Sequence, residues 1–137
     1  MEKFKFLPHT ADIKFQAFGS SLKKVFENSA LALFNTFYDG KVKEKKKFKI
    51  ISRGHDIESL LYNFLEEFLF LFDSKHFLPC KIKNLKLDAK NFKIEAEVFG
   101  DNIKNYKTSV YVKAITYNEM FVKKQENKFI SQVVIDV

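Results

Sequence analysis

The sequence predicts an α+β protein, a two-layer sandwich in which two helices pack on a largely antiparallel sheet. Two segments, 21–37 and 57–72, place apolar residues three and four positions apart, as amphipathic helices do. Most of the remaining chain alternates apolar and polar residues between short turn-like stretches, which is the pattern of half-buried strands. Several predicted strands follow one another directly after Pro79, so we expect hairpin connections and antiparallel pairing.

The length and composition fit one globular domain over residues 1–137. A chain of 137 residues is long enough to bury roughly two-thirds of its unfolded surface. Apolar residues make up 46% of the chain and charged residues 30%, which is typical of a folded protein rather than a disordered tail.

The first half of the chain predicts two strands, a helix, a strand and a second helix. Phe4 and Phe6 alternate with lysines, "LPHTA" turns the chain, and a second alternating segment starts at Ile13. Ser21 is the expected N-cap of a helix that ends near Phe37. A lysine-rich run, "KVKEKKK", then leads into the strand "FKIIS".

The second predicted helix begins after "RGHD", with Asp56 as its N-cap. Its apolar residues cover more than half of the helix circumference, so we expect a central helix that is packed on several sides. The strands predicted beyond it are "KIKNLKLD", "NFKIEAEVF", "KTSVYVKAITY", "EMFVKK" and "KFISQVVID". This gives two helices and about eight strands.

The net charge of +7 permits an RNA, acidic-protein or membrane-surface partner without selecting among them. The run "KEKKK" is most simply a solvated strand edge that blocks edge-to-edge pairing, and an RNA-facing role is the alternative. Lysines that alternate with phenylalanines along strands favour buried aromatic rings over rings offered to bases.

The sequence predicts a cytoplasmic protein without a membrane segment. Its most apolar stretch, 57–72, is too short to span a bilayer and carries Glu66 and Glu67. A lone cysteine, Cys80, excludes an internal disulfide and fits a reducing compartment.

Motifs for catalysis are missing from the sequence, so we expect a protein that is not an enzyme. It contains no Gly-rich phosphate loop, no nucleophile elbow and no C-x-x-C pair. The three histidines, His9, His55 and His76, show no metal-ligand spacing, and we interpret the last two as structural residues at a turn and a helix end.

Asp136 stands out because it follows three apolar β-branched residues in the terminal "VVIDV". Its carboxylate and the α-carboxylate of Val137 are one residue apart, and two such anions repel each other. Either this end frays into water or a cation lies between them. Carboxylate oxygens suit calcium, magnesium or manganese, and Asp12 could complete such a site if the fold brings it there.

Five motifs, in order along the chain, resemble the archease family. They are "FLPHTADI", "GSSLKKVFENSALALF", "DIESLLYNFLEEFL", "VKAITY" and the terminal "VVIDV". The similarity covers nearly the whole chain, and its most specific part is H-T-A-D combined with an aspartate one residue from the C-terminus.

The resemblance implies an archease-like fold and a non-catalytic accessory role. Archeases assist the GTP-dependent RNA-splicing ligase in tRNA splicing and RNA repair, promoting guanylylation of the ligase and multiple turnover. The implied partner is that ligase, with tRNA contacted indirectly. The implied cofactor is a divalent metal, calcium first, with manganese or magnesium as alternatives. Carried over, its ligands are Asp12, Asp136 and Val137, and His9 is a supporting or structural residue.

The chain departs from the family pattern at two places and leaves one alternative open. The stretch before "VKAITY", which is basic or contains histidine in the family, is "NYKTSVY" here and has no histidine. Asn118 follows "VKAITY" where many archeases carry a histidine, so any contact made by that histidine differs here. The alternative function is a basic RNA-binding or chaperone-like module without a metal-dependent role. The sequence predicts no oligomeric state.

Overall fold

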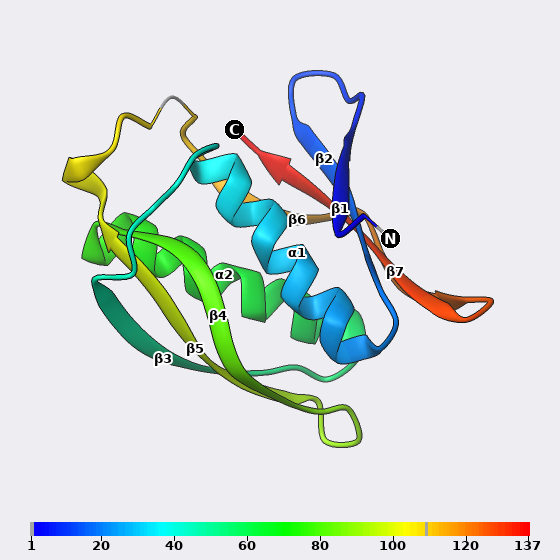
Figure 1. Cartoon of the computed structure of the whole chain (residues 1–137). Coiled ribbons are helices and arrows are strands. Elements are labelled where there is room, and N and C mark those ends of the chain that lie inside the picture. The colour runs from blue at the N-terminus through cyan, green and yellow to red at the C-terminus, as the bar shows by residue number, and fades with distance from the viewer. Residues whose placement is uncertain (1, 109) are drawn as a thin grey trace.

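A computed structural model describes residues 2–108 and 110–137 (Figure 1). The elements in chain order are β1 (Phe4–Leu7), β2 (Ile13–Gly19), α1 (Leu22–Phe37), β3 (Lys46–Arg53), α2 (Ile57–Lys75), β4 (Phe77–Asp88), β5 (Lys93–Asn102), a 3-10 turn (Ile103–Asn105), β6 (Ala114–Gln125) and β7 (Lys128–Asp136).

The strands form two antiparallel sheets with the helices between them (Figure 1). Sheet A has the order β1-β2-β7-β6, and sheet B has the order β3-β5-β4. The α+β class and the antiparallel pairing are therefore confirmed. The strands divide between two sheets because β3 and β4, which each follow a helix, pair with β5 on the other side of the helical layer.

Both helices begin at the residues that the sequence predicts. The Ser21 side chain accepts a hydrogen bond from the backbone N–H of Lys24 at the start of α1. Asp56 and Ser59 form a reciprocal capping box at the start of α2. This helix continues to Lys75, three residues beyond the predicted segment, and His76 ends it in the left-handed conformation with φ 52°.

The core lies between the two sheets and is rich in aromatic rings. Phe64 and Phe68 of α2 are fully buried, which confirms that this helix is central. Phe37 of α1 stacks on Phe72 with ring centroids 4.2 Å apart. Among the described residues, no helix is both long and apolar enough to cross a membrane.

The chain between residues 106 and 125 differs from the prediction. The segment "KTSVYVKAITY" was expected to be a strand. Its residue 109 lies outside the described residues, and β6 begins at Ala114. The two strands expected at "KAITY" and "EMFVKK" are one strand with a bulge, because its register with β7 shifts between Thr116 and Phe121. The described chain therefore has seven strands. At the bulge, Tyr117 stacks on Tyr62 of α2 with ring centroids 4.2 Å apart.

Candidate functional site

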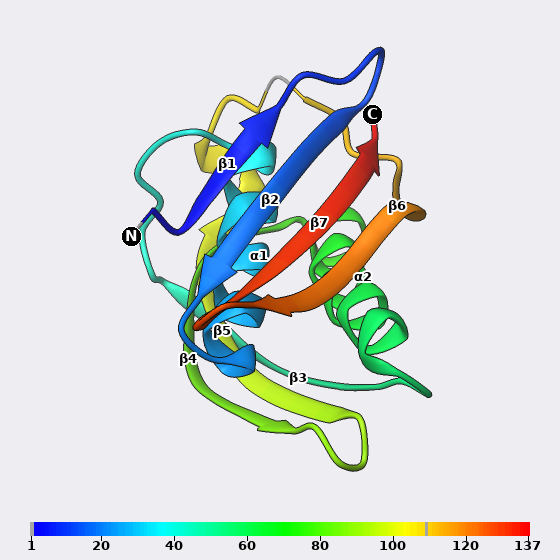
Figure 2. The same cartoon turned by 90° about the vertical axis from the view of Figure 1, so that its right-hand side faces the viewer.

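Asp12 and Asp136 meet at one end of sheet A. Strands β2 and β7 pair in a register whose last pair is Ile13 with Ile135, so Asp12 and Asp136 are the next residues on that ladder. Asp136 is itself paired with Ala114 of β6, and its carbonyl accepts a hydrogen bond from the N–H of Lys113. The end of the chain is thus held in the sheet, and Figure 2 shows the end of β7 alongside the start of β2.

Asp136 belongs to the outer face of sheet A, which points away from the helices. The side chains of Gln16 and Gln132, an opposed pair further along the same ladder, are hydrogen-bonded to each other on this face. Residues two apart on a strand share a face, so Asp136 lies on the same face as Gln132. Val137 follows with its side chain packed against the core.

His9 lies beside Asp12 in the loop between β1 and β2. Its Nδ1 is 3.8 Å from Asp12 Oδ2, which is an ion-pair distance but too long for a hydrogen bond. This nitrogen is buried and has no hydrogen-bond partner among the described residues. The other ring nitrogen, Nε2, is 3.0 Å from Oε2 of Glu119. His9 therefore bridges Asp12 and Glu119.

Glu119 is a site residue that the sequence analysis missed. It lies in the bulge of β6 with φ 55°, a left-handed conformation that is uncommon for glutamate. Lys14 Nζ donates to Glu119 Oε1 at 3.0 Å, and Gln132 Nε2 donates to the Glu119 carbonyl at 2.8 Å. The hydrogen bond from Lys14, followed by that from His9, lowers the pKa of Glu119 below its usual value. The carboxylate thus ties the β1–β2 loop to the bulge.

A pocket of about 430 Å³ borders Asp12 on the side of helix α1. It is lined by the loop residues His9 and Asp12, by Lys14, and by Asn35 and Thr36 near the end of α1. Asp12 is therefore accessible from this pocket, whereas Asp136 does not line it.

The donor set at this end fits a hard divalent cation. Asp12 and Asp136 supply carboxylate oxygens, and the α-carboxylate of Val137 is one residue away. The buried, unpartnered Nδ1 of His9 next to Asp12 adds a polar atom that a metal-bound water could satisfy. No cluster of three His, Cys, Asp or Glu side chains able to hold a metal occurs in residues 2–108 and 110–137.

Of the other residues considered in the sequence, Asn118 lies next to Glu119 in the β6 bulge, and His55, His76 and Cys80 lie on other elements. His55 precedes the N-cap of α2 and His76 is its C-cap, at the positions predicted for them. Asn118 is exposed in the β6 bulge, and its N–H donates to Thr116 Oγ1. Burial, followed by the nearby Glu44 carboxylate, raises the pKa of the Cys80 thiol to about 11.

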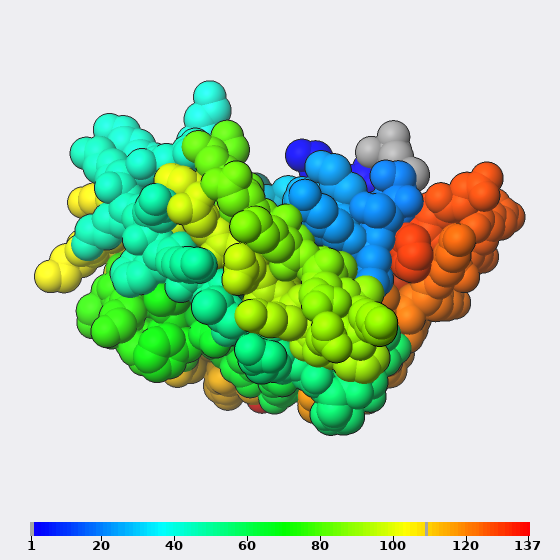
Figure 3. Space-filling model, turned by 90° about the horizontal axis from the view of Figure 1, so that it is seen from below, coloured from blue at the N-terminus to red at the C-terminus, as the bar shows by residue number. Residues whose placement is uncertain are grey.

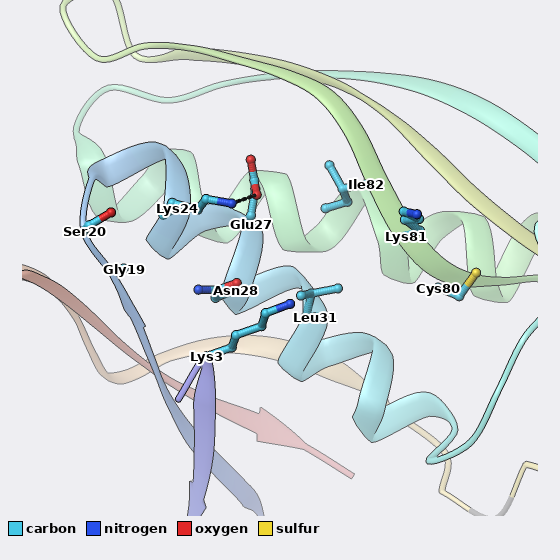
Figure 4. Close-up of a pocket in the computed structure, with 10 residues that line it drawn as sticks. All are labelled: Lys3, Gly19, Ser20, Lys24, Glu27, Asn28, Leu31, Cys80, Lys81 and Ile82. Carbon is cyan, nitrogen blue, oxygen red and sulfur yellow. Dashed lines mark hydrogen bonds and ion pairs between the residues drawn. The ribbon is translucent and has the colours of Figure 1, made fainter. Parts of the chain in front are cut away.

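A larger hollow of about 620 Å³ lies between the first half of α1 and strand β4 (Figure 4). Several of its polar side chains have partners within the protein. Lys24 Nζ is 3.3 Å from Glu27 Oε2, and Asn28 Nδ2 donates to the Phe18 carbonyl at 2.6 Å. Cys80 also lines the hollow, and its raised pKa leaves the thiol protonated at neutral pH. We therefore place the candidate site at the end of sheet A.

The fold and this site define a small α+β protein built around two helices, with two aspartates brought together at the end of one sheet. The family model of the Archease protein family matches residues 4–137. The chain belongs to the archease family.

Curated relatives match over nearly the full chain. The archease of Methanosarcina acetivorans is 36% identical, covering 99% of this chain and 97% of the relative. The archease of Sulfurisphaera tokodaii is 36% identical over 100% of both chains. An archease-like protein of Drosophila melanogaster is 38% identical, covering 86% of this chain and 78% of the relative.

Two solved structures share the fold. A solution structure of a Methanobacterium thermoautotrophicum protein is 33% identical, with a TM-score of 0.79 over 100% of both chains. A crystal structure from Thermotoga maritima, described as an archease and possible chaperone, is 19% identical with a TM-score of 0.66. It covers 97% of this chain and 96% of its own, and at this identity it shows the fold alone.

Proposed function

We propose that this protein is a non-catalytic activator of the GTP-dependent RNA-splicing ligase, promoting ligase guanylylation and multiple turnover in tRNA splicing and RNA repair. Membership of the archease family supports the accessory role. The observation that carries the proposal for this chain is the placement of Asp12 and Asp136 at the end of one ladder of sheet A. We propose that they and the Val137 carboxylate hold a divalent cation, calcium first, with manganese or magnesium as alternatives.

The chain's own residues would give this site its shape. The β2–β7 ladder fixes Asp136 and starts directly after Asp12, so neither aspartate needs a large rearrangement to share a ligand. His9 and Glu119 connect the loop that carries Asp12 to the bulge of β6. A bound cation would supply positive charge between the carboxylates. The adjoining pocket leaves room for a carboxylate or phosphate of the ligase complex.

A mixture of this protein with its cognate ligase, GTP and manganese tests the proposal, with guanylylated ligase followed over time. The wild-type protein should raise the rate and the number of turnovers, and alone should neither join RNA ends nor hydrolyse GTP. Asp12→Ala and Asp136→Ala should reduce the rate to that of the ligase alone. Asp73→Ala, which removes an exposed aspartate from α2, is the matched control and should activate fully.

Two results would contradict the proposal. Ligase turnover that does not change at equimolar wild-type protein would remove the accessory role. Full activation by Asp12→Ala or Asp136→Ala, with wild-type thermal stability, would show that the metal ligands are assigned wrongly. Both variants should fold normally, because each removes an acceptor from a carboxylate pair and not a packed apolar group.

A chaperone-like module is the second candidate, because the Thermotoga maritima relative is described as a possible chaperone. Client binding of that kind needs a contiguous apolar surface. The large exposed apolar residues of this chain are spread over several elements, namely Phe6, Ile51, Phe70, Tyr111 and Tyr117. Suppression of the aggregation of an unrelated unfolded protein at stoichiometric ratio would favour this candidate over the ligase activator.

A further inference from the structure

The outer face of sheet B, which points away from the helices, consists of four rows of side chains. Residues directly opposite each other in antiparallel strands lie on the same face, so the register defines the rows. Read from β3 through β5 to β4, the rows are Lys47–Phe99–Lys81, Lys49–Glu97–Lys83, Ile51–Glu95–Lys86 and Arg53–Lys93–Asp88. Figure 3 views the molecule from the side of this sheet.

Positive side chains outnumber carboxylates on this face. Lysines or arginines occupy both outer strands, whereas the two glutamates lie on the central strand, β5. Lys47 Nζ is 3.1 Å from Glu97 Oε2, and Lys86 Nζ is 3.9 Å from Glu95 Oε1. Hydrogen bonds from Asn84 and then from Lys47 lower the pKa of Glu97, so it is ionised at neutral pH. Glu44, just before β3, lies 3.8 Å from Lys81 Nζ and 3.3 Å from Lys83 Nζ. Asp88 adds a further carboxylate on β4. These carboxylates neutralise part of the face, and its seven basic side chains still leave an excess of positive charge.

Phe99 is the central residue of the first row and has no carboxylate beside it in that row. Its ring is partly exposed, with Lys83 Nζ 4.4 Å and Lys47 Nζ 6.0 Å from its centroid. The sequence analysis expected the alternation of lysine and phenylalanine to bury the rings, and it does bury most of Phe48, which packs on Phe77. Phe99 is an exception, because its position on β5 places its ring on the outer face, with Glu97 and Glu95.

We propose that the outer face of sheet B binds single-stranded RNA, with Lys47, Lys81 and Lys83 contacting phosphates and Phe99 contacting one base. Proteins that bind single strands without sequence preference combine a positive surface with an aromatic ring on which a base stacks. A partly exposed ring among cations on a sheet face has this chemistry. It follows from this face alone and does not depend on the metal site.

The same features argue for RNA over the other partners of a basic surface. A membrane surface favours large apolar side chains that protrude between the lysines. On this face only Ile51 is a well-exposed large apolar residue, at 48% exposure. An acidic protein would pair with the lysines but would not need the aromatic ring at the centre of the most positive row.

Such binding should be weak at physiological salt and should strengthen steeply as salt is removed. Each phosphate neutralised on a single strand contributes about 0.7 to the slope of log affinity against log salt. Removal of the three lysines Lys47, Lys81 and Lys83 should therefore lower this slope by about 2.

The test measures the anisotropy of a fluorescein-labelled 12-residue oligouridylate, titrated with protein between 50 and 200 mM KCl. The sheet B variant is a triple variant that combines Lys47→Gln, Lys81→Gln and Lys83→Gln. It should bind at least tenfold more weakly at 50 mM salt. The control variant is Lys123→Gln, Lys124→Gln, Lys128→Gln on the β6–β7 hairpin. It removes the same net charge, and these lysines also lie over phenylalanine rings. It should lose less than threefold.

Phe99→Leu tests the ring separately from the charge. Leucine keeps the site apolar but removes the aromatic face, so affinity should fall about tenfold with the salt slope unchanged. Thermal unfolding and circular dichroism of each variant establish that the fold is retained. Asp12→Ala should bind the oligonucleotide as the wild type does, which separates this surface from the proposed metal site.

Equal losses in the two triple variants would overturn the proposal, because the effect would then be net charge alone. Unchanged affinity in Phe99→Leu, or no binding by the wild type at 50 mM salt, would overturn it as well. Vesicles containing phosphatidylserine and a polyglutamate peptide serve as competing probes. The proposal would also be overturned if the vesicles or the peptide bound the wild type more tightly than the oligonucleotide does and did not bind the sheet B variant. The face would then bind a membrane or an acidic protein instead.

Discussion

At the centre of sheet B, Glu97 of β5 lies between Lys49 on one neighbouring strand and Lys83 on the other. At the end of sheet A, Asp136 of β7 lies between Ala114 and the position of Asp12. The first carboxylate is neutralised by the chain itself, and the second has another carboxylate as its neighbour. A row whose charges do not balance within the chain indicates where an external ion or partner binds. This difference underlies the two proposals made above, a cation at the end of sheet A and a polyanion on the outer face of sheet B.

The largest effect is expected when a lysine replaces Asp136, because a carboxylate at the end of sheet A then has an ammonium neighbour, as the glutamates of sheet B do. Asp136→Lys places an ammonium group next to Asp12 and removes one proposed ligand. Calcium affinity measured by calorimetry should fall at least about a hundredfold, since affinity follows the number of charged ligands. The melting temperature without calcium should rise by about 1–3 °C, because a carboxylate repulsion becomes an attraction. Unchanged calcium affinity would contradict the comparison.

A smaller loss is expected when the α-carboxylate is moved. A short Gly-Ser tail after Val137 keeps Asp136 and every packed side chain but replaces the terminal carboxylate with a neutral amide carbonyl. Calcium should then bind about tenfold more weakly, because a charged ligand is lost and a weaker oxygen ligand remains. Deleting Val137 should have a similar effect, because it leaves the carboxylate on Asp136 in the wrong place. A tailed protein with wild-type calcium affinity and full ligase activation would exclude the terminus as a ligand.

The next effect concerns Glu119, which connects the site to the β6 bulge. Glu119→Gln weakens the contacts with Lys14 and His9, so the loop carrying Asp12 should be held less firmly. Calcium affinity should fall two- to fivefold, the range expected for an exposed ion pair that acts only by positioning. Glu126→Gln, which changes an exposed glutamate with a similar positive φ of 57° in the β6–β7 turn, should bind calcium as the wild type does. Equal affinities of the two variants would leave Glu119 without a role in the site.

The smallest effect is expected at Glu97 and depends on pH. Because its pKa is lowered in the folded protein, its stabilising contribution is present above the unfolded-state pKa and is lost as the pH falls through the folded value. Glu97→Gln should therefore lower the melting temperature at pH 7 by about 1–2 °C. The difference between variant and wild type should disappear once the pH falls below the lowered pKa of Glu97, where the wild-type carboxylate becomes protonated. A difference that stays constant from pH 7 to pH 3 would mean that the lost interaction is not electrostatic.

The sequence predicted local features well and non-local ones poorly. Ser21 and Asp56 were recognised as N-caps because a cap depends on residues three positions away. The bulge at Glu119 was missed, and its partners His9 and Lys14 are 110 and 105 residues distant. The outward position of Phe99 also depends on the register of β5 between two strands, which a single sequence does not contain. The pairing of β2 with β7, which places Asp12 beside Asp136, has the same origin.

The protonated state of Cys80 makes the protein convenient for distance measurements. Because its pKa is raised to about 11, the thiol is almost entirely protonated at pH 7.5, so maleimide reagents should react with it slowly. A second cysteine on an exposed turn, such as Ala89→Cys between β4 and β5, would therefore label selectively with the native residue left in place. A dye there and another on a ligase or an RNA would report in solution which end of the molecule each partner approaches.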